Sequence, residues 1–186
     1  MMMLHFQFWP LPEIQTQRLL LRQLLTKDAD AFFLLRCNEK VNQFMKRRPA
    51  QSLEETEEII FNINEGITNK QWLYWAIVLQ ENKKLIGTIT LWQFSDEGNN
   101  AEIGFELHPD FQHKGYMQEA VAAVTAFAFK QMQLKKLYAW THRNNIASIK
   151  LLKKNNFKRD EAAEQEHAES VLAKNMAIYF LLNMDD

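Results

Sequence analysis

The chain has 186 residues, with 22 lysines and arginines, 23 aspartates and glutamates, and a single cysteine, Cys37. This length is most simply one domain with a substantial core of its own. A formal net charge of -1 gives no general attraction to nucleic acid or to an anionic membrane. One cysteine cannot form an internal disulfide, so we expect a reducing, cytoplasmic environment. Because Cys37 lies in a predicted helix, we expect it to be a small core residue rather than a nucleophile.

The opening stretch MMMLHFQFWPLP is apolar, but it lacks the basic region and the small-residue cleavage site of a signal peptide. We expect residues 1–13 to form an arm that packs on a single domain of residues 14–186 or on a partner subunit, which leaves a homodimer open. The longest small and apolar stretch, AVAAVTAFAF, is about half the length that a bilayer requires. No membrane span is therefore expected.

Two kinds of hydrophobic spacing divide the chain into strands and helices. In chain order they predict a strand over 17–24, helices over 26–38 and 52–67, strands over 72–80, 85–94 and 101–108, a helix from about 116, a strand over 135–142, a helix over 145–157 and a last strand over 177–183. Thr26 or Asp28 can cap the first helix. Ser52 and Glu55 form a capping box for the second, and Gly66 is expected to end it.

This order predicts a mixed α/β fold, with two early helices, an antiparallel meander, and then a strand, a helix and a strand. The meander carries aromatic residues that alternate along its strands: Trp72, Tyr74, Trp75, Trp92 and Phe94. Such residues are more often core than pocket lining, although an acceptor pocket is the alternative. The acidic residues 160–169 look helical, and they would attract a cationic amine if they folded over that pocket.

The segment PDFQHKGYMQEA, residues 109–120, joins the third meander strand to the following helix. A loop between parallel strands that are joined through a helix lies at the carboxyl end of the sheet, where ligands commonly bind. The helix begins near Tyr116, so its free N–H groups and positive dipole end point into the loop. Gly115 permits an unusual dihedral, and Lys114 adds charge. These features describe a pyrophosphate cradle, while a turn that uses glycine only for geometry is the alternative.

Within this segment, QHKGYM (112–117) resembles the acyl-CoA-binding signature of the GNAT acetyltransferase superfamily, Gln/Arg-x-x-Gly-x-Gly/Ala. The preceding strand resembles the branch that acetylates the N-termini of ribosomal proteins. Downstream, NNIASIKLLKKNNF is similar to the second motif of that branch, and TQRLLLRQL near the amino end resembles its first strand. The resemblance spans residues 14–182, and the motifs occur in the expected order.

The resemblance implies a GNAT-like fold, with a central, mostly antiparallel twisted sheet, one splayed parallel strand pair and about four flanking helices. It implies an N-acetyltransferase that moves an acetyl group from acetyl-CoA to a primary amine within a ternary complex. The acceptor is then a protein N-terminus, such as that of a ribosomal protein, or a small amine. We expect no DNA partner, RNA contact only with a ribosomal acceptor, and no metal, because His113 and His142 are isolated.

Roles of individual residues also follow from the resemblance. Backbone N–H groups of the loop bind the pyrophosphate, the preceding strand pairs with the pantetheine arm, and an asparagine hydrogen-bonds the pantetheine amides. The implied cofactor-binding residues are Phe105, Glu106, Leu107, Gln112, His113, Lys114, Gly115, Tyr116, Met117, Asn145 and Ser148. An N–H group near Leu107 also polarises the thioester carbonyl.

Acetyl transfer needs a neutral amine and a proton for the departing thiolate. Many relatives supply this proton from a tyrosine on the last long helix, where this chain has Leu152. In the resembling branch, a serine at the position of Ser148 is the catalytic candidate; a helix serine bonded to its own backbone is the alternative. Glu102 is the candidate that takes the amine proton through water, and Glu106 alternates to the same face. For both glutamates, the alternative is a solvated charge at the sheet edge.

Two residues depart from the family pattern. Met117 stands where glycine or alanine is usual, so its side chain must find room in the helix packing. Asn156 replaces the glycine before Phe157, which is a mild change because asparagine tolerates a left-handed conformation. Met117 and Leu152 keep a second hypothesis open, a non-catalytic acyl-CoA-binding protein with the same fold.

A basic cluster surrounds the last predicted helix. It comprises Lys150, Lys153, Lys154, Lys158 and Arg159, with His142 and Arg143 just ahead. Such runs are usually a solvated face, but this one could meet the 3′-phosphate of CoA or ribosomal RNA. A structural RNA-associated protein is therefore a third hypothesis, which predicts strongly salt-dependent RNA affinity.

Overall fold

The computed structural model describes residues 10–45, 47–167 and 175–184. Its strands are β1 (Ile14–Gln15), β2 (Leu19–Arg22), β3 (Leu73–Leu79), β4 (Leu85–Trp92), β5 (Asn100–Leu107), β6 (Lys136–His142), β7 (Lys158–Arg159) and β8 (Met176–Leu182). Its helices are α1 (Ala29–Arg36), α2 (Glu39–Asn42), α3 (Leu53–Thr68), α4 (Tyr116–Lys130), α5 (Ile146–Lys154) and α6 (Glu161–Glu166). Every predicted strand is present, with ends that differ from the prediction by a few residues.

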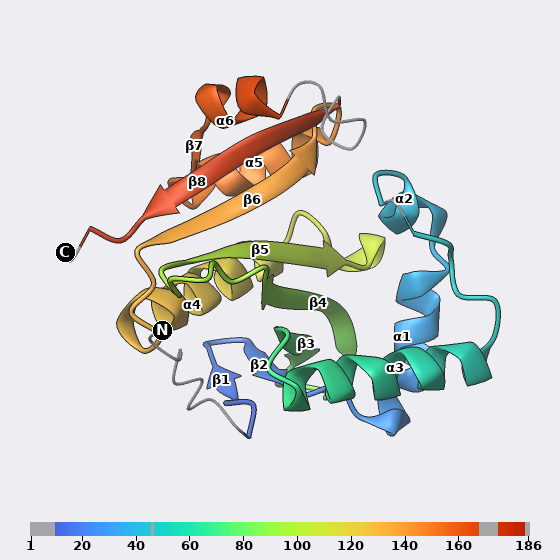
Figure 1. The fold of residues 1–186 in the computed structure, drawn as a ribbon. Coiled ribbons are helices and arrows are strands. Elements are labelled where there is room, and N and C mark those ends of the chain that lie inside the picture. Colours follow the sequence, from blue (N-terminus) through green and yellow to red (C-terminus); the bar gives the residue numbers. More distant parts are fainter. Residues whose placement is uncertain (1–9, 46, 168–174, 185–186) are drawn as a thin grey trace.

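A single eight-stranded sheet runs through the molecule in the order β1-β2-β3-β4-β5-β6-β8-β7 (Figure 1). Every neighbouring pair is antiparallel except β5 and β6, which are parallel because α4 connects them. The predicted mixed α/β class, with a meander and one parallel pair, is confirmed.

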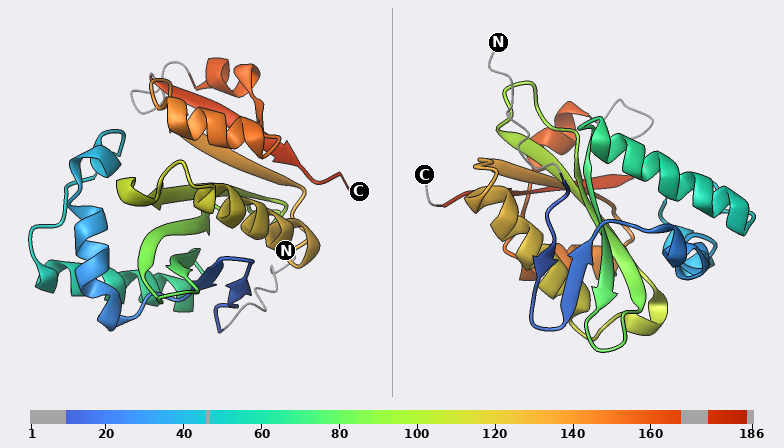
Figure 2. Two further views of the ribbon diagram at one scale, coloured as in Figure 1. Left: turned by 180° about the vertical axis from the view of Figure 1, so that it is seen from behind. Right: turned by 90° about the horizontal axis from the view of Figure 1, so that it is seen from below.

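Helices cover both faces of this sheet. Figure 2 shows α4 on one side and α3 on the other, with the strands of the meander between them. On the α4 side, Trp75 of β3 is fully buried and meets the ring of Phe127 edge-on, with centroids 5.7 Å apart. On the opposite side, α1 packs against α3 and β4. This second face carries the polar residues described below.

The first predicted helix is shorter than expected. A 3₁₀ turn occupies Thr26–Asp28, α1 begins at Ala29, and no side chain caps α1. Asp28 does not act as the predicted cap because its carboxylate instead pairs with Arg22 at 2.7 Å. The helix does not continue to residue 38, because the Asn38 side chain caps the separate helix α2.

The start of the second predicted helix is confirmed, but its predicted end is wrong. The Ser52 hydroxyl caps α3 by accepting the N–H of Glu55 at 3.2 Å. The helix then passes Gly66 and continues to Thr68. Gly66 is a packing residue, because a Cβ atom there would lie 2.0 Å from the indole of Trp72. Close approach of an aromatic ring, and not helix termination, explains this glycine.

Three further predictions concern single segments. Cys37 follows α1 directly and is only half-buried, so the expected core position is wrong. Of the predicted arm, residues 1–9 lie outside the described residues, whereas Leu11 is buried and the Pro12 carbonyl accepts the Trp75 indole N–H at 2.8 Å. The acidic stretch forms α6 up to Glu166. Across the described ranges, no helix is long and apolar enough to cross a membrane.

Candidate active site

The loop before α4 has the backbone of an anion-binding turn. Gly115 is the N-cap of α4 with a φ of 80°, and His113 also has a positive φ of 62°. The N–H of Gln112 is donated to the Pro109 carbonyl at 3.1 Å, which closes a 3₁₀ turn. The N–H groups of residues 113–117 make no hydrogen bond to the described part of the chain, as expected at a helix start. Five adjacent donors therefore face the loop.

Arg18 braces this loop against the amino-terminal part of the sheet. Its guanidinium donates to the Lys114 carbonyl at 2.9 Å and to the Glu119 carboxylate at 2.6 Å. The same carboxylate accepts the Thr16 hydroxyl at 2.6 Å. The guanidinium also lies 4.5 Å above the ring of Tyr116. Sequence reasoning missed this brace because Arg18 and Glu119 are 101 positions apart, although TQRLLLRQL was one of the matching motifs.

Strands β5 and β6 separate just beyond Glu102. Their pairing covers only Asn100 to Glu102 on β5, after which the two strands diverge (Figure 1). The His108 N–H bonds the Ile86 carbonyl on β4, so by alternation the backbone groups of Glu106 also face β4. Those of Phe105 and Leu107 therefore face the gap. The edge for the predicted pairing with an extended ligand is therefore at these two residues and not at Glu106, and the Leu107 carbonyl there already accepts the Gln112 side-chain amide at 3.1 Å.

Glu102 lies at the point where the two strands part. It pairs across the sheet with Trp92 on β4 and with Tyr138 on β6. Burial raises the pKa of its carboxyl to about 7, against a smaller opposing effect of hydrogen bonding to Trp92. A carboxyl that titrates near neutral pH is suited to accept a proton from an amine and release it again.

Glu106 shares the face of Glu102, as predicted, but it is not a solvated edge charge. It is 6% exposed, it forms an ion pair with Arg47, and it accepts the Thr88 hydroxyl at 3.1 Å. Tyr74 in turn donates to Thr88 at 3.0 Å. The Glu106 carboxylate is therefore held in a polar network, whereas Glu102 forms no ion pair with the described residues.

The start of α5 lies beyond the end of β6. The Asn145 side chain caps this helix by accepting the N–H of Ser148 at 3.1 Å. The Ser148 hydroxyl is half-buried and forms no hydrogen bond with the described residues, so the alternative of a serine bonded back to its helix is not observed. Leu152 is fully buried, so no helix side chain at that position supplies a proton. Asn156 has a φ of 63°, as expected for its left-handed position.

The basic cluster divides into two groups. The four lysines are exposed: Lys150, Lys153, Lys154 and Lys158. Arg143 and Arg159 instead bind Glu164 of α6, at 2.6 and 2.9 Å. These two arginines hold α6 against the sheet and are not a free cationic surface.

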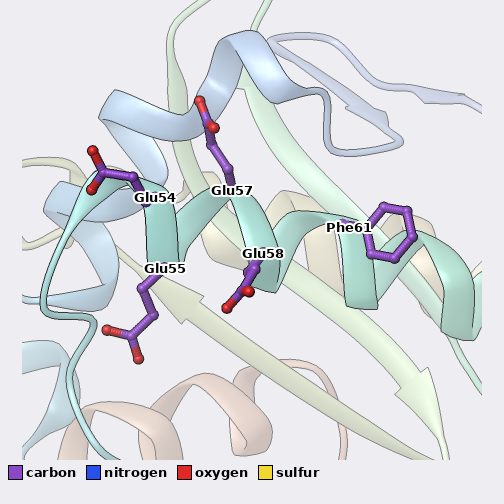
Figure 3. A pocket seen from close by; sticks show the side chains of 5 residues that line it. All are labelled: Glu54, Glu55, Glu57, Glu58 and Phe61. Atoms are coloured by element: carbon purple, nitrogen blue, oxygen red, sulfur yellow. The ribbon is translucent and has the colours of Figure 1, made fainter.

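A hollow lined by acidic side chains lies on α3. Figure 3 shows its lining, which consists of Glu54, Glu55, Glu57, Glu58 and Phe61. The side chains point in several directions from α3, and none of them comes from β5, the strand that carries Glu102. No group of three or more His, Cys, Asp or Glu residues in the described ranges is arranged to hold a metal ion.

Comparison with known proteins identifies the fold and the family. Residues 18–158 match the model of the acetyltransferase (GNAT) domain. The uncharacterized N-acetyltransferase YoaA of Bacillus subtilis (strain 168) is 29% identical over 154 residues, which cover 83% of this chain and 87% of the relative.

Solved structures share this architecture. An acetyltransferase (GNAT family) from Bacillus anthracis has a TM-score of 0.76 at 23% identity, over 92% of this chain and 98% of that one. RimL, a ribosomal L7/L12 alpha-N-protein acetyltransferase in complex with coenzyme A, has a TM-score of 0.78 at 18% identity, over 94% and 100% of the two chains. Together with the match over most of its length, the sheet with one parted parallel pair places this chain in the GNAT acetyltransferase family.

Proposed function

We propose that the protein transfers an acetyl group from acetyl-CoA to a primary amine within a ternary complex. The observation that carries this proposal is the edge of β5 beyond Glu102, which does not pair with β6 and is followed, after one 3₁₀ turn, by the open N–H groups at the start of α4. An extended chain that ends in a pyrophosphate fits this sequence of donors and acceptors. CoA has both parts.

The residues present fit CoA. The N–H groups of 113–117 and the positive end of α4 would hold the pyrophosphate. Gly115 keeps the loop open, because it adopts a left-handed conformation that side chains disfavour. Phe105 and Leu107 would pair with the pantetheine arm by backbone. The Asn145 side chain would meet the arm from the opposite side of the gap.

Proton transfer falls to two side chains. Acetyl-CoA supplies the acetyl group as a thioester, whose carbonyl would be polarised by the N–H of Leu107. Glu102 would take a proton from the amine, through water, as the N–C bond forms. Ser148 would give a proton to the sulfur as the C–S bond breaks. Glu102 would then return its proton through water to the Ser148 oxygen, which restores both side chains without a further reactant.

The acceptor in this proposal is a protein N-terminus or a small amine. The structural likeness to RimL supports an N-terminus, and a ribosomal acceptor would then bring the exposed lysines near RNA. The lone cysteine supports a reducing compartment such as the cytoplasm. Buried Leu152 favours one other candidate, a protein that binds acyl-CoA without turnover.

Thermal shift measurements with acetyl-CoA, CoA and ADP in parallel test the proposal. A ligand that binds only the folded state raises the free energy of unfolding, by about 2.7 kcal/mol when its concentration is a hundred times Kd. The melting temperature rises with it. A shift with acetyl-CoA, followed by thiol release on addition of an amine, is the expected result. A shift without thiol release for any amine would favour the non-catalytic candidate. No shift at millimolar acetyl-CoA would overturn both.

A further inference from the structure

A polar network lies on the face of the sheet that α1 covers. Its hydrogen bonds run from Tyr74 to Thr88, from Thr88 to Glu106, and from Arg47 to Glu106. Arg47 also donates to the Asn42 side chain at 2.9 Å, which ties the network to α2. Every member of this chain of contacts therefore has a partner.

Arg36, the last residue of α1, adds a second cation to this network. Its side chain forms no ion pair or hydrogen bond with the described residues, and its buried Nε has no partner. It rests over the ring of Phe32, 5.6 Å from the centroid. Burial, and then the nearby Arg47, lower the pKa of the Arg36 guanidinium. Glu106 and Glu55 act in the opposite direction, but their carboxylates pair with Arg47 and Arg48 and neither forms an ion pair with Arg36.

The charges of this network do not balance. Arg36 and Arg47 contribute two positive charges, and Glu106 contributes one negative charge that Arg47 already binds. A partly buried guanidinium without a counterion is costly, and an oxyanion that supplies bidentate hydrogen bonds relieves this cost. An anion bound to Arg36 would therefore balance the charges of this network.

This site lies on the same face of β5 as the proposed point of acetyl transfer. Glu102 and Glu106 occupy one face of β5, four residues apart, which is about 13 Å along a strand. The segment after α2 also reaches across to β6, since Phe44 stacks on His142 with centroids 5.3 Å apart. An acceptor whose amine lies near Glu102 and whose chain extends along β5 would reach Arg36 several bonds from the amine.

We propose that Arg36 selects acceptors that carry a carboxylate several bonds from the acetylated amine, such as a peptide N-terminus followed by an acidic residue. The carboxylate would bind the Arg36 guanidinium, and Arg47 would keep Glu106 from competing for it. This inference rests on the proposed function and adds the chemical class of the acceptor. A free amino acid offers the same carboxylate at a shorter distance from the amine.

Matched pairs of amines test this inference. The peptide amides Ala-Asp-amide and Ala-Asn-amide differ only in the side-chain carboxylate, and alanine and alaninamide differ only in the α-carboxylate. We expect kcat/KM to be about ten- to hundredfold higher for Ala-Asp-amide than for Ala-Asn-amide, the range for hydrogen bonds to a charged group. The free amino acid pair should show a smaller difference.

Arginine variants locate the effect. Arg36→Gln should remove the preference for the carboxylate. Arg48→Gln is the matched control, because Arg48 directly follows Arg47 in the chain, its side chain is 69% exposed, and it pairs with Glu55. This control should keep the preference. A preference that survives in Arg36→Gln, or that is absent in the wild type, would overturn the inference.

Calorimetry separates this inference from the proposed function. The two peptides are titrated into the protein saturated with CoA, and their Kd values are compared. Equal Kd and equal turnover for both peptides would remove the inference and leave acetyl transfer standing. Selective binding of Ala-Asp-amide without turnover of any amine would keep the inference and remove the transfer reaction. If neither peptide binds, the proposed role of Arg36 in binding the acceptor carboxylate is overturned as well.

Discussion

Replacement of Glu102 by Gln should stop acetyl transfer and, at the same time, stabilise the fold above neutral pH. The side chain is nearly isosteric, but an amide cannot accept the amine proton. Loss of a general base typically lowers the rate by a factor of about 10² to 10⁴. Affinity for acetyl-CoA should stay unchanged, because the proposed cradle does not include this side chain.

The stability effect follows from the raised pKa. Burial raises the pKa of the Glu102 carboxyl from its ordinary value of 4.5 to about 7. An unfolded chain releases this proton first, so stability is highest below pH 4.5 and falls as the pH rises through 7. Above pH 7, the raised pKa lowers the free energy of unfolding by at most about 3 kcal/mol, since each pKa unit corresponds to about 1.4 kcal/mol. Glu102→Gln should therefore raise the melting temperature at pH 8 and have little effect at pH 4.

Two variants make this test specific. Glu97→Gln, at an exposed glutamate in the turn before β5, should change neither the rate nor the melting temperature. Trp92→Phe removes a hydrogen bond that favours the charged carboxyl, so the acidic limb of the kcat/KM profile should move to higher pH. An acceptor amine that ionises near 8 does not respond to Trp92. Full activity of Glu102→Gln, or an acidic limb that stays in place, would refute the assignment.

Three other variants, the first with a matched control, test the cradle, the proton donor and the support of α6. Gly115→Ala and Gly98→Ala both place alanine at a positive φ and should lose similar stability, about 1–2 kcal/mol, but only Gly115→Ala should weaken acetyl-CoA binding in thermal shift, by about tenfold or more. Ser148→Ala should lower kcat about a hundredfold or more and leave the thermal shift with acetyl-CoA intact; an unchanged kcat would exclude Ser148 as the acid. Glu164→Gln should destabilise the fold by about 2 kcal/mol at pH 7. Hydrogen bonding to an arginine lowers the pKa of Glu164 to about 2, so its stabilisation is lost as the pH falls from 4.5 toward 2, and the melting curves of the variant and the wild type should converge there.

The features that sequence reasoning found are those with a local cause. Runs over 72–108 that are rich in β-branched and aromatic residues, separated by polar turns, predict the meander. The left-handed conformations of Gly115 and Asn156 follow from their positions at the ends of a loop and a helix. In these cases, the neighbours that decide the conformation lie within a few residues along the chain.

The features that it missed depend on contacts between distant segments. Arg36, Arg47 and Glu106 meet only because α1 and the segment after α2 fold over one face of the sheet. Glycine at position 66 is explained by its close contact with Trp72, and not by the local rule that glycine ends helices. The pKa of Glu102 likewise depends on burial, which no spacing in the sequence gives. Charge balance within a folded cluster is therefore information that only the structure supplies.

Met117 shows why a departure from a motif need not remove the site. Its side chain is 7% exposed and lies on the core face of α4, with Ala120, Val121 and Val124. It therefore points away from the loop, while its N–H remains at the open helix start. Phosphate binding at such a start uses backbone donors, so the size of the side chain matters only through packing.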